Sequence, residues 1–83
     1  MNISVDEVEA HFAHDYGLRA LAAYFRAGNT EQPSGSIMRY TVGGKDYVVL
    51  DNANGILAVY RLKTDGKLKS MKRWPEVLDE IAG

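Results

Sequence analysis

The stretch Ile37 to Leu62 reads IMRYTVGGKDYVVLDNANGILAVYRL, and it decides the expected fold class. It consists of short runs rich in β-branched and aromatic residues, separated by Gly43-Gly44 and Asn54-Gly55. Such pairs indicate hairpins, because type I′ turns need positive φ at both central residues. Asp65-Gly66 follows as a third pair. The pattern predicts a four-stranded antiparallel meander, with strands at about residues 37–42, 47–51, 56–62 and 67–72.

A first helix is expected near the N-terminus. Ser4 and Glu7 have the spacing of a capping box, in which the serine hydroxyl accepts from the glutamate amide and the carboxylate reaches back to the serine amide. Val5, Val8 and Phe12 then recur at helical spacing. These signals predict a helix at about residues 5–14.

A second helix and a short C-terminal helix complete the expected fold. Gly17 is a natural helix terminator, and the apolar stripe that follows it predicts a helix at about residues 18–27. The stripe consists of Leu18, Leu21, Ala22 and Phe25. Pro75, at a first helical position, predicts a last helix at about residues 75–82. The expected class is α+β, one domain in which two N-terminal helices pack on one face of the four-stranded sheet.

The composition excludes several functions. The chain has 83 residues and no cysteine, which removes disulfides, thiolate metal sites and thiol catalysis, and suits a reducing compartment. The N-terminus has neither a basic start nor an apolar run. The longest apolar runs are far shorter than the roughly 20 residues that cross a bilayer. We therefore expect a cytoplasmic protein with no membrane partner.

No motif in the sequence indicates catalysis or a cofactor. Glu7, His11 and His14 share a face of the expected first helix, which is how two imidazoles and a carboxylate reach one metal ion. No fourth ligand accompanies them, and exposed histidine and glutamate are routine on amphipathic helices. A phosphate-binding loop and a nucleophile elbow are both absent from the sequence. We expect no enzyme activity, no metal and no other cofactor.

Basic residues are concentrated in one segment. The formal net charge is −1, yet between Arg61 and Arg73 the only acidic residue is Asp65. The residues expected to bind a partner are Arg61, Lys63, Lys67, Lys69, Lys72 and Arg73, with Trp74 as an anchor. Lysine and arginine neutralise phosphates and an exposed aromatic ring stacks on bases, which favours a nucleic-acid surface. Two structural roles compete, because edge lysines block strand pairing and tryptophan anchors helices to cores.

The favoured hypothesis is a non-catalytic protein-interaction or inhibitor module whose partner carries an acidic patch. Segregated charge steers a protein toward an oppositely charged surface, and tyrosine, of which the chain has five, is enriched at interfaces. The small size and lack of an enzymatic signature suit an accessory protein of a phage or other mobile element. The alternatives are self-association as a homo-oligomer and nucleic-acid binding through the basic strand Arg61 to Trp74; the sequence pI near 6.1 disfavours nucleic acid.

Overall fold

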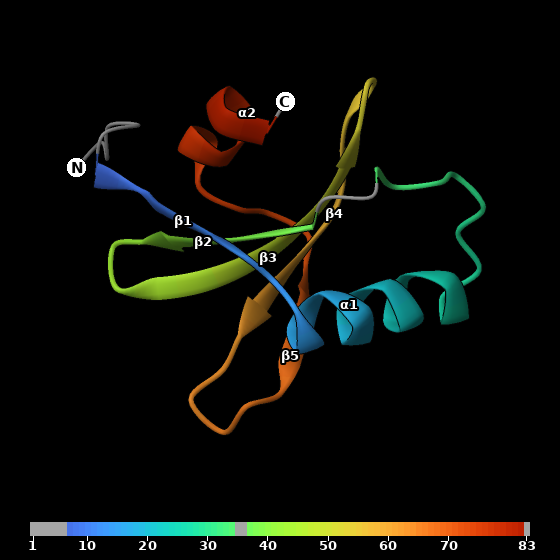
Figure 1. Cartoon of the computed structure of the whole chain (residues 1–83), viewed down its shortest axis with the longest axis horizontal. Coiled ribbons are helices and arrows are strands. Elements are labelled where there is room, and N and C mark those ends of the chain that lie inside the picture. The colour runs from blue at the N-terminus through green and yellow to red at the C-terminus, as the bar shows by residue number, and fades with distance from the viewer. Residues whose placement is uncertain (1–6, 35–36, 83) are drawn as a thin grey trace.

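The computed structural model describes residues 7–34 and 37–82, which form one five-stranded antiparallel sheet and two helices. The elements in chain order are β1 (Glu9–Phe12), α1 (Asp15–Arg26), β2 (Met38–Val42), β3 (Lys45–Asn52), β4 (Gly55–Leu62), β5 (Leu68–Met71) and α2 (Glu76–Ala82). The strands lie in the sheet in that same order, so β1 and β5 are its edges (Figure 1). Within the described part of the chain, neither helix has the length and apolar character needed to cross a membrane.

The expectation of a helix at about residues 5–14 is wrong, because β1 occupies its second half and pairs antiparallel with β2 along its whole length. The Ser4 cap and the expected start at Val5 lie outside the described residues. Val8 and Phe12, four residues apart, fall on one face of a strand as well as on one face of a helix. Pairing with β2 favours the strand, because it satisfies the backbone groups of both segments. The sheet therefore has five strands, and the expected four is also wrong.

The arrangement of two N-terminal helices on one face of the sheet is wrong as well. One helix, α1, lies between β1 and β2 in sequence and covers one face, while α2 covers the other (Figure 1). Gly17, expected to end a helix, lies inside α1 and is buried. A Cβ atom built on it would lie 3.3 Å from the Cβ of Ile37. The missing side chain thus lets α1 approach the sheet closely.

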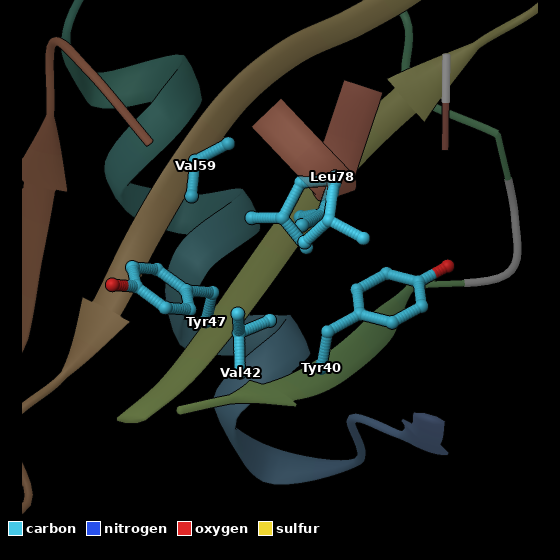
Figure 2. Close-up of a cluster of buried hydrophobic side chains, with 7 residues drawn as sticks. Tyr40, Val42, Tyr47, Val59 and Leu78 are labelled. Carbon is cyan, nitrogen blue, oxygen red and sulfur yellow. The ribbon is translucent and has the colours of Figure 1, made fainter. Parts of the chain in front are cut away.

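The face of the sheet under α2 holds one buried cluster. Leu78 of α2 is fully buried there, and Figure 2 shows it among side chains from three strands. These strand residues are Tyr40, Val42, Tyr47 and Val59. Since successive strand residues point to opposite faces, the residues between them supply the other core.

The face under α1 holds the second buried cluster. Val48 and Leu50 of β3 and Tyr60 of β4 pack there against Ala20 and Tyr24 of α1. The central strands are therefore buried on both faces, as the apolar character of both faces of the expected 56–62 strand predicts. Burial on two faces is what gives so small a chain two separate hydrophobic clusters.

The orientation of α1 differs from the one its apolar stripe predicts. Gly17, Ala20 and Tyr24 face the sheet, whereas Leu18 is 68% exposed and Phe25 is 38% exposed. Small residues on the buried face allow a close approach, and the Tyr24 hydroxyl donates a hydrogen bond to a loop carbonyl at 2.9 Å. The most apolar side of the helix is therefore only partly covered.

The hairpin turns follow the glycine pairs with one difference. Gly43 and Gly44 have φ of 57° and 79°, as a type I′ turn requires. In the next hairpin Asn52 pairs with Gly55, so the loop residues are Ala53 and Asn54, one position earlier than predicted. The Asn52 side-chain oxygen accepts from the Asn54 amide at 2.8 Å and stabilises this loop.

Candidate binding site

The seven predicted binding residues are spread over β4, the β4–β5 loop, β5 and the connection to α2. Arg61 and Lys69 are cross-strand partners in β4 and β5. Lys63 lies 3.9 Å from Asp65 in the hairpin loop between these strands. Lys72 and Arg73 are exposed in the connection between β5 and α2. Of the seven, Lys67 is the one that lines the groove between α1 and β5 in the described part of the chain.

Trp74 contributes to the core. Its side chain is partly buried against the cluster under α2, and its indole N–H donates to the Asp79 carboxylate at 3.1 Å. The indole thus ties the connection after β5 to the first turns of α2. This position matches the anchoring role that the sequence offers as the alternative to base stacking.

A groove of about 570 Å³ lies between α1 and β5, and we call it the cationic groove. Three cations line it, namely Arg19 and Arg26 from α1 and Lys67, which directly precedes β5. The remaining lining residues are Ala22, Ala23, Ala27, Tyr60, Leu68 and Ser70. The described residues that line it include no carboxylate.

Arg19 makes contacts both within α1 and with the β4–β5 loop. Its Nη2 atom donates to the Gly66 carbonyl in the β4–β5 loop at 2.9 Å. Its guanidinium carbon lies 5.5 Å from the centroid of the Tyr16 ring, within cation–π distance. One arginine therefore connects α1 to the hairpin that carries β5.

The cationic side chains of the groove form no ion pair with the described carboxylates. Of the ten lysines and arginines in the sequence, only Lys63 lies within ion-pair distance of a carboxylate in residues 7–34 and 37–82. The side chains of Arg26 and Lys67 thus have no ion-pair partner among those residues, although the Lys67 backbone amide donates to the Asp65 carboxylate at 3.0 Å. The Arg19 guanidinium donates to a neutral carbonyl. Clefts lined by one sign of charge concentrate ligands of the opposite sign. The groove is therefore suited to an anionic ligand.

A second hollow, of about 580 Å³, shares Arg19 with the groove and lies at the start of α1. Arg39 and the exposed ring of Phe12 also line it, together with the carboxylate-bearing Asp15. The Arg39 Nε atom is buried and has no hydrogen-bond partner in the described part of the chain. The acidic side chain makes this hollow less uniformly positive than the groove.

The metal-site hypothesis assumed that Glu7, His11 and His14 share one face of a helix, and the structure contradicts that assumption. His11 lies in β1 and His14 precedes α1, so the three residues Glu7, His11 and His14 do not share a helix. His11 instead lies 3.8 Å from the Glu9 carboxylate. No group of three metal-ligating side chains comes together within the described ranges.

The sequence pattern did not identify two of the groove cations, Arg19 and Arg26, because they lie in α1 and outside the basic segment Arg61 to Arg73. Arg19 and Arg26 are seven residues apart, a spacing that places them on one side of a helix two turns apart. This spacing, with alanines between them, is the signal that could have found one wall. The opposing wall depends on which strand lies beside α1, and that is a tertiary feature.

Two buried tyrosines, Tyr40 and Tyr60, are expected to make the stability of the fold decrease at alkaline pH. Burial raises the pKa of the Tyr60 phenol, with a smaller contribution from Tyr24, and burial followed by the Asp51 charge raises the pKa of Tyr40. In the unfolded chain the phenols ionise from about pH 10. The stability that the buried, neutral phenols contribute to the fold is therefore complete below that pH, and it is lost as the pH rises through their raised pKa values in the folded state. Urea unfolding from about pH 8 to 11 should show falling stability, and Tyr40→Phe/Tyr60→Phe should flatten the fall. An unchanged slope would contradict the assignment.

Comparison of the chain with protein-family models, with curated proteins and with solved structures finds no match. The functional proposal therefore rests on the geometry and charge of the cationic groove.

Proposed function

We propose that this protein is a small non-catalytic interaction module that binds an acidic segment of another protein in the cationic groove. One observation carries the proposal: two cations from α1 and one from the loop before β5 line one groove without any carboxylate on its described walls. An acidic segment supplies the compensating charges, and bound in the groove it is withheld from other partners. Such masking fits an inhibitor. The cysteine-free sequence supports a cytoplasmic location as part of the same proposal.

Nucleic acid is less well supported as the ligand. Binding of single strands combines cations with exposed aromatic faces on which bases stack. The aromatic residue in the groove, Tyr60, is buried, and Trp74 packs against the core on the other side of the sheet. The remaining walls offer alanine methyl groups and Leu68, which suit the side chains of a peptide better than a base.

The proposal predicts that removing groove cations weakens binding of poly-L-glutamate. Arg26→Gln/Lys67→Gln removes two exposed ion pairs worth about 0.5 kcal/mol each, so affinity at low salt should fall about five-fold. The measurement is a titration of labelled polymer at low and physiological salt, with single-stranded and duplex DNA and RNA as parallel probes.

The matched control is Lys45→Gln/Arg73→Gln, which removes one lysine and one arginine that are exposed outside the groove. It should change affinity less than about two-fold, since only long-range screened charge is lost. Equal losses for the two variants would mean that diffuse charge, and not the groove, binds the polymer. Tighter binding to nucleic acid than to polyglutamate would replace the protein ligand by a nucleic-acid ligand.

A further inference from the structure

The outer edge of β5 is open for pairing. The strand order places β5 at the end of the sheet, and β4 is the only described strand that pairs with it. An open edge presents backbone N–H and C=O groups that can pair with another chain. This edge borders the cationic groove, because residues of β5 form part of the groove wall.

The register identifies which backbone groups point outward. The Lys63 amide donates to the Lys67 carbonyl at 2.8 Å, so these two residues direct those backbone groups toward each other next to the β4–β5 ladder, which begins at Leu62 and Leu68. Hydrogen-bonded and non-hydrogen-bonded pairs alternate in an antiparallel ladder. Lys69 therefore directs its backbone groups toward β4, whereas Leu68 and Ser70 direct theirs to the open edge.

The same two residues line the cationic groove. A strand that paired with the outward groups of Leu68 and Ser70 would therefore lie along the groove. Alternate side chains of such a strand would face the side of the sheet covered by α1, where Arg19 and Arg26 lie. Backbone pairing and charge recognition thus converge on one segment.

We propose that the acidic partner binds as an added strand on β5, in extended conformation, with acidic side chains at alternate positions over the cationic groove. This inference rests on the function proposed above and specifies how the ligand is held. Strand addition of this kind takes affinity from main-chain hydrogen bonds and specificity from alternate side chains. The lysines that flank the edge then select against strands without acidic residues.

The test uses a peptide of about eight residues in which glutamate and valine alternate. On titration of the full chain at low salt, followed by NMR, the amide protons of Leu68 and Ser70 should shift downfield and become protected from hydrogen exchange. A peptide methylated on alternate backbone nitrogens, on the pairing edge, should bind at least about tenfold more weakly.

Two proline variants test the register. Ser70→Pro removes an N–H that points outward, so the fold should persist, because proline is tolerated at edge positions whose N–H faces solvent. Its affinity for the peptide should fall at least about tenfold. Lys69→Pro removes an N–H that points toward β4, and it should lower the unfolding midpoint in urea markedly more.

The outcomes separate the added strand from the proposed function. If Arg26→Gln/Lys67→Gln weakens peptide binding while the methylated peptide and Ser70→Pro bind as before, the added strand is overturned and the acidic ligand stands. Absence of amide shifts at Leu68 and Ser70 on a saturated wild-type complex overturns the added strand even if Ser70→Pro fails to fold. If neither the peptide nor polyglutamate binds, both proposals fall.

Discussion

Replacement of Leu50 by alanine is expected to lower the free energy of unfolding by about 2–5 kcal/mol. Leu50 lies in β3 and is fully buried in the cluster that α1 covers, so truncation removes apolar contacts and leaves a cavity. A chain of this length has a total stability of only about 4–12 kcal/mol. The variant should therefore be partly unfolded at room temperature or unfold at much lower urea, as measured by circular dichroism.

Leu18→Ala is the matched control, because it makes the same chemical change on the exposed side of α1. Leu18 is 68% exposed, so the expected change is within about 0.5 kcal/mol. The sequence pattern alone predicts the opposite, since Leu18 belongs to the stripe expected to face the core. A loss for Leu18→Ala as large as for Leu50→Ala would contradict the orientation of α1.

The antiparallel sheet from residue 38 onward could be predicted because its signals are local. Glycine pairs set the turns, and the apolar runs between them set the strands. The structure places β2, β3, β4 and β5 within about two residues of the expected ranges, the usual error of boundary assignments. Tight turns fix the order of neighbouring strands, so the meander follows from the same signals.

The N-terminal half could not be predicted because its local signals support two structures. Val8 and Phe12 satisfy both a helical and a strand spacing, and the choice depends on the open edge of β2. Gly17 acts through its contact with Ile37, a residue beyond the next loop. In both cases a tertiary contact overrides a local preference.

The candidate binding site was predicted in part. Lys67 was identified from the basic segment, whereas the other basic residues of that segment do not line the groove. Arg19 and Arg26 belong to a segment whose charge looks unremarkable. Opposing walls from distant segments produce the positive groove, so no count of charges along the chain could reveal it.

The cluster under α2 provides the second large stability prediction, Leu78→Ala, again with an expected loss of about 2–5 kcal/mol. Isolated helices shorter than about 12 residues are marginal in water, so α2, with seven residues, depends on packing for its stability. Leu78 is fully buried among strand side chains (Figure 2), and its truncation removes the central contact of α2 with the sheet. The measurement is urea unfolding followed by tryptophan fluorescence, since Trp74 packs against the same cluster.

Glu80→Ala is the control on the same helix, because Glu80 is exposed and its removal should change stability by less than about 0.5 kcal/mol.

The Leu78 variant also distinguishes the two faces of the sheet. The cationic groove lies on the face covered by α1, so the folded fraction of Leu78→Ala should bind the glutamate–valine peptide with wild-type affinity. A stability loss as small as that of Glu80→Ala would mean that α2 does not depend on Leu78 for its packing. A loss of peptide affinity in the folded fraction would mean that α2 contributes to the binding surface.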